Sequence, residues 1–384
     1  MVSEFNDPFI MLRKIFFNNS INDKITKFFN VLLIIIYSLV HSLQIYYMYK
    51  NFSMNLLVRY SPTTLFVLFA IVTTVFSVAF EKKIFEMSTI LDQLCWPLSM
   101  IQKKAQIKIE RKCQIINIFT SIVSLVFLSS TIVNSPWFGS QKDFFICFIV
   151  FEEYFGEWSF IPYYCYFVGI TFLYYHFLRA CFLFVYGFLE VQLQFFLIEE
   201  YLSQIYEIDD EKNWDYLQDI RYQEGIGKSL RLCIKHHNDL KKLVKMIVNI
   251  VLKGLPLFVL FGILLLISSM AFIINFADTM TNIIKIRIYS YLASNLCISI
   301  LLCWIGQQLI NVSSNIFFTL AEAPWYFWNR DNRIIFLIFM TNCIKNESIV
   351  LAGICVDYQL IVSVLRTSAS YVLVFYNLRK NGLV

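Results

Sequence analysis

The chain has 384 residues, of which 58% are hydrophobic and only 15% charged, and its formal net charge is +5. A mean hydropathy of +0.62 excludes an ordinary soluble globular domain. Glycine and proline are too scarce, at 11 and 7 residues, for collagen-like or disordered linker segments. The composition therefore predicts one membrane-embedded domain.

Apolar runs along the chain predict seven membrane-spanning helices. A helix needs roughly 20 residues to cross the hydrocarbon core of a bilayer, and six runs approach or exceed this length. They lie near residues 27–49, 59–80, 114–134, 160–188, 247–275 and 286–312. A seventh run, 349–378, carries Asp357 and Arg366 and follows a shorter apolar helix at 333–345. We therefore expect an all-α integral membrane protein, whose first span directs insertion because residues 1–26 lack the features of a signal peptide.

Lysine and arginine set the orientation, because cytoplasmic loops retain positive charge. With the N-terminus inside, the inner segments hold 22 of these residues and the outer segments hold seven. Seven spans then put the C-terminus outside, the reverse of a G-protein-coupled receptor, and the glycosylation sequon at Asn51 falls in the first outer loop. The expected segments are a cytoplasmic N-terminus (1–26), transmembrane helices 1–4 (27–189), cytoplasmic extensions of helices 4 and 5 (190–246), transmembrane helices 5–6 (247–312), a cytoplasmic anchor segment with a short helix 7a (313–348), helix 7b (349–378) and an extracellular tail (379–384).

The segment 190–246 is the one stretch with the composition of a soluble protein. Acidic residues alternate there with aliphatic ones such as Leu193, Leu197 and Leu202. Apolar residues three and four positions apart beside charges indicate amphipathic helices, which would continue the fourth and fifth spans as a cytoplasmic anchor. A solvated charged loop is the alternative.

Motifs that carry enzyme chemistry are absent from the sequence. It has no phosphate loop, dinucleotide fingerprint, zinc-protease motif or nucleophile elbow, and its four histidines lack acidic partners at triad or ligand spacing. The ten cysteines are scattered singly, mostly in apolar runs, which favours buried free thiols over a zinc site or a disulfide framework. We expect no enzyme activity, no cofactor, no metal and no nucleic-acid partner.

The C-terminal sixty residues carry a diffuse but ordered pattern. It comprises Trp325-Tyr326 after Ala321-Glu322-Ala323-Pro324, the helix 333–345, Val350-Leu351-Ala352-Gly353, Leu365-Arg366-Thr367-Ser368-Ala369-Ser370-Tyr371 and Val372-Leu373-Val374-Phe375-Tyr376-Asn377-Leu378. In its order and its spacing to the C-terminus, this pattern resembles the last third of insect odorant receptors. The ending departs from the Thr-Tyr and Gln-Phe pairs of gustatory receptors, and the chain is short beside the odorant co-receptor. The resemblance therefore favours an odor-tuning subunit.

The resemblance implies a ligand-gated, non-selective cation channel in the plasma membrane of olfactory sensory neurons. Its subunits would form a hetero-oligomer, expected to be a tetramer, with the odorant receptor co-receptor, and the last helix of each subunit would line the pore. The side chains Ser363, Thr367, Ser370, Val374 and Asn377 recur every three or four residues and share one helical face, as a water-lined pore requires. A helix–helix contact rich in small residues would give the same pattern.

The pore and gate residues that the resemblance implies are Thr367, Ser370, Val374, Asn377 and Leu378. Val374 would be the hydrophobic gate, because a ring of apolar side chains stops ions by dewetting when it is narrow. Arg366 would be unfavourable in a cation pore. We expect it to pair with an acid such as Asp357 of another subunit, or to lie off the pore axis.

Odorants are small, volatile and mostly apolar, so their cavity should combine aromatic and aliphatic side chains with a few polar groups. In this family the cavity lies in the outer halves of the second, third, fourth and sixth spans. The candidates in those halves are Phe66, Phe69, Thr73, Phe127, Ser130, Thr131, Tyr163, Tyr166, Phe167, Ile170, Tyr289, Ser290 and Tyr291. Ordinary helix packing would explain any one of them, so the prediction concerns the group, with Tyr163, Tyr166 and Phe69 foremost.

Three other classes of membrane protein stay open at this point. A gustatory-type receptor that works as a homomeric channel shares the architecture. A G-protein-coupled receptor would need the C-terminus inside. A secondary transporter would carry inverted repeats and matched glycine or proline breaks in its two halves, which the sequence does not show.

Overall fold

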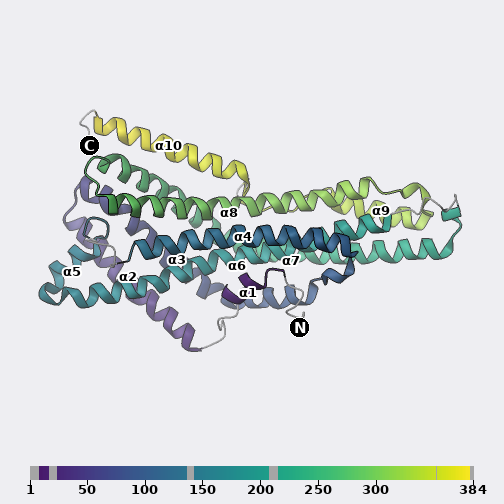
Figure 1. Ribbon diagram of the computed structural model, residues 1–384, viewed down its shortest axis with the longest axis horizontal. Helices are drawn as coiled ribbons and strands as arrows, with labels where there is room; N and C mark the ends of the chain where they lie inside the picture. Colours follow the sequence, from purple (N-terminus) through teal and green to yellow (C-terminus); the bar gives the residue numbers. More distant parts are fainter. Residues whose placement is uncertain (1–7, 17–23, 136–141, 207–214, 352, 381–384) are drawn as a thin grey trace.

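The structure is a computed structural model that describes residues 8–16, 24–135, 142–206, 215–351 and 353–380. Long helices dominate it and run side by side along one axis (Figure 1). Its elements in chain order are α1 (Ile10–Phe16), α2 (Lys24–Lys50), α3 (Met54–Leu94), the 3-10 turn η2 (Leu98–Met100), α4 (Lys103–Val133), α5 (Cys147–Phe155), η3 (Gly156–Ser159), α6 (Phe160–Tyr206), η4 (Asp215–Leu217), α7 (Ile220–Phe276), α8 (Asn282–Ala321), η5 (Trp325–Phe327), α9 (Arg330–Cys343), β1 (Val350–Leu351), β2 (Ile354–Cys355) and α10 (Tyr358–Lys380).

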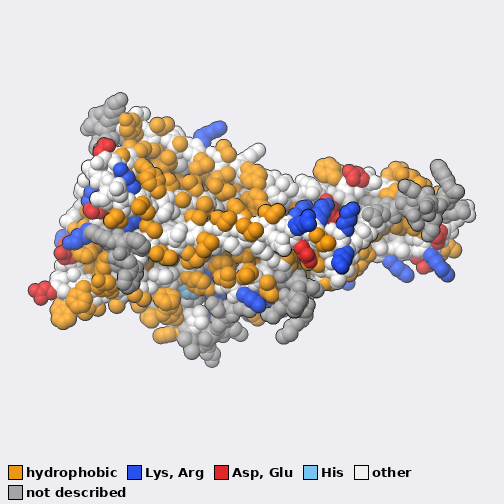
Figure 2. All heavy atoms as spheres, viewed as in Figure 1, with side chains coloured by type: hydrophobic (Ala, Val, Ile, Leu, Met, Phe, Trp, Pro, Cys, Tyr) orange, Lys and Arg blue, Asp and Glu red, His pale blue; other side chains and the backbone are white. Residues whose placement is uncertain are grey.

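Six of the described helices, α2, α3, α4, α6, α7 and α8, are long and apolar enough to cross a bilayer. A seventh helix, α10, contributes a shorter apolar stretch, Tyr358–Val374. The predicted all-α membrane protein is therefore confirmed. Figure 2 shows apolar side chains covering the broad part of the molecule, and lysines and arginines gathering where it narrows toward α9.

The fourth predicted span, α6, is the centre of the bundle. In its apolar window 89% of the residues are buried, because α3, α7 and α8 pack around it. Side chains such as Leu173, Phe182 and Val191 are fully enclosed. In contrast, α10 lies at one edge of the bundle against α7 and α8 (Figure 1).

Several helices extend well past the apolar runs that predicted them. The helix α3 continues to Leu94 and α4 begins at Lys103, whereas the runs covered 59–80 and 114–134. In the first turns of α4, Ala105, Ile109 and Cys113 are buried while the lysines between them face outward. An amphipathic stripe thus extends each span beyond the bilayer. The same happens in α6, which continues to Tyr206, and in α7, which begins at Ile220. Helix α9 packs against the extension of α7.

The expectation of one helix over 349–378 is wrong at its start. Residues 350–351 pair with residues 354–355 as two antiparallel strands, and helix α10 begins only at Tyr358. Gly353 has a φ of +83°, which glycine tolerates without strain and which a helix would not allow. Asp357 then caps α10, because its Oδ1 accepts hydrogen bonds from the backbone N–H groups of Gln359 (2.8 Å) and Leu360 (3.1 Å).

Candidate functional site

Aromatic rings from four helices meet in the half of the bundle nearer α5. The Phe66 ring of α3 lies 4.8 Å from Tyr174 and 5.4 Å from Phe177, both on α6, and 5.2 Å from Tyr291 on α8, centroid to centroid. Phe127 of α4 stacks on Phe177 at 5.7 Å. Most of these pairs are edge-to-face, the arrangement that ring quadrupoles favour. We call these five rings the aromatic cluster.

A small, partly open cavity lies beside the aromatic cluster, and its empty space of about 250 Å³ includes open solvent. Polar groups of α4 and α8 share its wall with the rings. The aromatic cavity is lined by Phe66, Phe127, Ser130, Thr131, Asn134, Tyr174, Tyr291, Ser294 and Asn295. Apolar rings with a few hydroxyls and amides are the chemistry that binds a small, mostly apolar molecule and fixes its orientation.

Hydrogen bonds hold the polar side of the aromatic cavity in place. The Tyr291 hydroxyl donates to the carbonyl of Pro62 on α3 at 2.9 Å. The Ser294 hydroxyl lies 3.4 Å from the carbonyl of Val126 on α4, and the Asn295 amide donates to the carbonyl of Tyr291 at 3.1 Å. The side chains of α8 are therefore tied to both α3 and α4, so this wall is built before any ligand enters.

Two further cavities continue from the aromatic cavity toward the base of α10. One encloses about 760 Å³ and shares Asn295 with the aromatic cavity. The other has about 590 Å³ of empty space and shares Leu255, Phe258 and Val356 with the 760 Å³ cavity. We call the two together the apolar cavity. Because Leu360, Ile361 and Val364 of α10 line it, the cavity reaches from the centre of the bundle to the edge helix.

The predicted ligand-binding residues fall into three groups. Phe66, Phe127, Thr131 and Tyr291, with Ser130, line the aromatic cavity, and Phe69 lines the apolar cavity beside it. Tyr163, Tyr166 and Phe167 pack instead against Phe148, Phe151 and Phe145 at the α5 end, and Ile170 is buried nearby on α6. Thr73 is buried with its hydroxyl bound to the carbonyl of Phe69, whereas Tyr289, 53% exposed, lies across the helix from Tyr291.

The rings of α6 and α7 that line the cavities were not among the predicted residues. Tyr174 and Phe177 follow Ile170 at steps of four and three, so the stripe that predicted Tyr166 and Ile170 continues directly into them. On α7, Phe258 and Phe261 both lie 5.0 Å from Phe69. The fifth span had been left out of the predicted cavity, and no sequence spacing links it to α3.

The polar stripe of α10 lies on a surface that the described residues of the chain leave uncovered. The Ser363, Thr367, Ser370 and Asn377 side chains are exposed, and Val374 is 53% exposed. Val372 on the other face is 4% exposed and packs toward the bundle. Leu378 belongs to α10, but its side chain lies outside the described residues. Arg366 is exposed and makes no ion pair within the described part of this chain.

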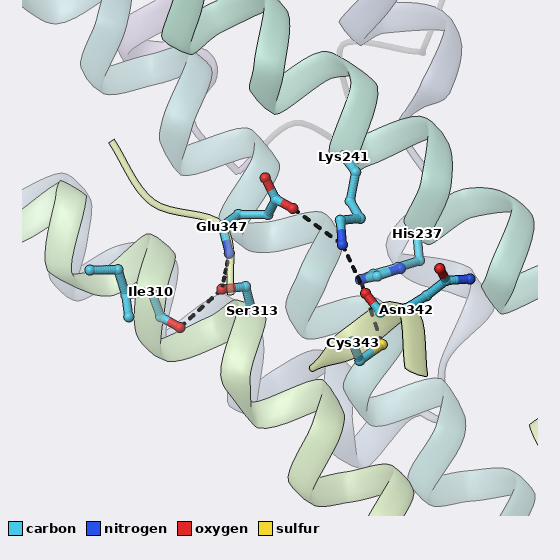
Figure 3. A network of polar contacts seen from close by, with 7 residues as sticks. All are labelled: His237, Lys241, Ile310, Ser313, Asn342, Cys343 and Glu347. Carbon is cyan, nitrogen blue, oxygen red and sulfur yellow. Dashed lines mark hydrogen bonds and ion pairs between the residues drawn. The ribbon is translucent and has the colours of Figure 1, made fainter. Parts of the chain in front are cut away.

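The segment before α10 is fastened to α7, α8 and α9 (Figure 3). Lys241 of α7 pairs with the Glu347 carboxylate at 3.3 Å and donates to the carbonyl of Asn342 at 2.8 Å. The backbone N–H of Glu347 donates to the Ser313 hydroxyl of α8 at 3.1 Å. Both charged side chains are largely buried, which strengthens the pairing. We call these contacts the α10 latch, because they fix where α10 starts.

A glycine allows the hairpin to approach α8 closely. A Cβ placed on Gly306 would lie only 2.0 Å from the carbonyl oxygen of Val356. Because the atom in the way belongs to the backbone, rotation of a side chain cannot relieve the clash. Any larger residue at 306 would therefore push the hairpin and the start of α10 away from the apolar cavity.

Comparison with known proteins gives the family and the fold. The sequence matches the family model described as 7tm Odorant receptor over residues 53–369. The chain is similar in structure to the insect olfactory receptor OR5 from Machilis hrabei, with a TM-score of 0.69, 12% sequence identity and 96% of each chain covered. It is also similar to that receptor in complex with eugenol, with a TM-score of 0.66, 12% identity and 97% of each chain covered. No curated protein sequence matches the chain.

Proposed function

Because this chain belongs to the 7tm odorant receptor family, we propose that it is an odor-tuning subunit that opens a cation channel when a small volatile molecule binds. The observation that carries the proposal is the aromatic cavity, which joins rings to hydroxyl and amide groups. Eugenol, which the structural neighbour binds, is likewise a small aromatic molecule with polar oxygens. The ligand class that the cavity suits best is therefore a compact, mostly apolar volatile.

The exposed face of α10 supports a pore that needs several subunits. One helix cannot enclose a pore, and its serine, threonine and asparagine side chains would lack partners against lipid. We propose that four subunits, this chain together with the odorant co-receptor, bring these faces around a central axis in the plasma membrane of olfactory sensory neurons. Val374 then forms the narrow apolar ring, with Thr367 and Ser370 on one side and Asn377 and Leu378 on the other.

The apolar cavity offers a physical route from ligand to gate. It adjoins the aromatic cavity at Asn295 and is walled by Leu360 and Val364 of α10. A ligand shifts an equilibrium only through different affinities for the two states. We propose that the ligand is bound more tightly when α10 has moved outward at its gate end, while the α10 latch holds its base.

Current recordings test this proposal. We expect volatile phenols and alcohols to evoke cation current when the chain is co-expressed with a co-receptor, and the response to depend on the aromatic cavity. Phe66→Leu should raise the half-maximal odorant concentration about tenfold, because a ring at the centre of a cavity is typical of a binding hot spot. The matched control is Phe182→Leu on α6, whose ring packs on Phe16 at 4.8 Å and should leave this concentration within about twofold.

The same recordings separate the alternatives. Equal sensitivity of both variants, at equal surface expression, would place the ligand elsewhere. Odor-evoked current from the chain alone would favour a homomeric, gustatory-type channel. Silence over a wide volatile panel, despite surface expression with the co-receptor, would count against the channel itself.

A further inference from the structure

Another cavity differs from the aromatic and apolar cavities because its wall is largely polar. It lies between α2, α3 and α6, is partly open, and its empty space of about 490 Å³ includes open solvent. The polar side chains of its wall include Lys27, Asn30, Ser77, Glu81, His176 and Arg179. We call it the polar cavity. Ionisable groups inside a membrane bundle are costly and are usually placed there for a function.

The polar cavity lies near the level at which two spans end. Lys27 opens the first apolar run of the sequence and Glu81 follows the second, and the two side chains pair at 3.3 Å. The short helix α1 lies against α6 at the same level: the Arg179 guanidinium donates through Nε to the carbonyl of Phe16 at 3.0 Å. The cavity therefore borders the membrane surface on the α1 side of the bundle, where lipid head groups lie.

Several polar groups of the polar cavity have bonding capacity that the protein does not use. Asn30 is 9% exposed, and its Oδ1 accepts no hydrogen bond within residues 24–380 as far as these are described. The two Nη atoms of Arg179 likewise have no hydrogen-bond partner among the described residues. Burying the Asn30 oxygen without a partner is unfavourable, and together with the available guanidinium N–H groups it indicates a molecule that supplies both a donor and an anionic acceptor.

The charge of the polar cavity gives the sign of that molecule. Lys27 and Arg179 carry two positive charges against the one negative charge of Glu81. Beside the cavity, α2 presents exposed apolar side chains, Phe28, Leu32, Ile35 and Ile36, along which hydrocarbon chains can lie. A lipid with a singly anionic head and donor groups matches the charge, the free acceptor and the apolar surface together.

We propose that the polar cavity binds the head group of an anionic phospholipid. The phosphate lies toward Arg179 and Lys27, a head-group hydroxyl or ammonium donates to Asn30 Oδ1 or Glu81, and the acyl chains follow the exposed face of α2. The site is separate from the aromatic cavity and does not depend on the proposed channel function. In the topology predicted from the sequence, the lipid belongs to the cytoplasmic leaflet.

Native mass spectrometry of the full chain, delipidated in detergent, tests this proposal. The probes are phosphatidylinositol, and phosphatidylcholine as a lipid with the same phosphate but no head-group donor. We expect phosphatidylinositol to bind about tenfold more tightly than phosphatidylcholine, and Arg179→Gln to weaken phosphatidylinositol binding about tenfold, because bonds to a charged group are worth about a tenfold change or more. The control, Lys83→Gln, changes an exposed lysine of α3 near Glu81 and should leave binding within about twofold.

A second variant keeps the test decisive if Arg179→Gln disturbs the contact with α1. Asn30→Leu has nearly the same shape, leaves the α1 contact intact and should also lower phosphatidylinositol binding several-fold. Equal binding of the two lipids, or unchanged binding in both variants, would overturn the proposal. Full displacement of the lipid by millimolar inorganic phosphate would also overturn it, because the site would then serve a soluble anion.

Discussion

The helices α6 and α10 are both apolar, yet the chain buries α6 and leaves much of α10 exposed. In the apolar window of α6, 89% of the residues are buried by the other helices of the same chain. Along α10, large apolar side chains such as Val362, Tyr371 and Leu373 remain exposed beside the polar stripe. The chain therefore buries α6 by itself, whereas one face of α10 is left uncovered by the described part of the chain. In the function proposed above, the central helix would serve stability and ligand binding, and the edge helix would serve assembly and gating.

The largest expected effect comes from truncating a buried side chain of the central helix α6. Phe182→Ala should lower the free energy of unfolding by about 3–5 kcal/mol, because it empties a fully buried position stacked against Phe16. Leu373→Ala, at a position 61% exposed on α10, should change it by less than about 0.5 kcal/mol. Unfolding of the purified chain in mixed micelles, titrated with a denaturing detergent, measures both. A larger loss at Leu373 would mean that α10 is part of the folded core.

The next-largest expected effect concerns the contact between α8 and the hairpin that precedes α10. Gly306→Ala should cost about 1–3 kcal/mol of stability and alter the ligand-free current, because the added methyl group meets the Val356 carbonyl. The control is Gly225→Ala in α7, where a Cβ meets nothing within 4 Å and the helix gains propensity. The same unfolding titration and current recordings compare them. Identical behaviour of the two variants would show that the hairpin is free to move.

A smaller effect concerns two neighbouring lysines. Lys241→Met removes the partly buried partner of Glu347 in the α10 latch, and a double-mutant cycle with Glu347→Gln should give a coupling energy of about 1–2 kcal/mol. Lys242→Met removes an exposed partner of Asp239 and should change stability by less than about 0.5 kcal/mol. Raising the salt concentration should weaken the second pair more than the first. Equal effects at 241 and 242 would show that the latch does not fasten the base of α10.

Much of the fold follows from the sequence because a helix that crosses the bilayer needs a long apolar run, and such runs can be located in the sequence. The hairpin that pairs residues 350–351 with 354–355 does not follow, since a short apolar run suits a strand or a helix equally and only Gly353 marks the turn. The helix α5 also escaped prediction, because nine residues that include two glutamates are too short to register as a span. Its packing over the α6 end is why Tyr163 and Tyr166 lie away from the aromatic cavity.

The candidate ligand site was predictable where helix periodicity applies. Phe66, Phe127 and Tyr291 came from separate spans, and the structure brings them together around α6. The contribution of α7 through Phe258 could not be foreseen, because which spans touch depends on three-dimensional packing that one sequence does not encode in its spacing. The sequence spacing predicts that the polar side chains of α10 share one helical face, but only the structure shows that no other helix of the described chain covers that face.

Helix α10 is proposed to turn one face to its own bundle and the opposite face to a pore, and substitutions at two of its valines test this arrangement. Val374→Thr and Val372→Thr make the same isosteric change at positions 53% and 4% exposed. With the co-receptor present, we expect Val374→Thr to increase ligand-free cation current, because a hydroxyl wets an apolar constriction. Val372→Thr should leave that current unchanged and only lower stability. An unchanged current in Val374→Thr at normal surface expression, or the same increase in both variants, would contradict the account.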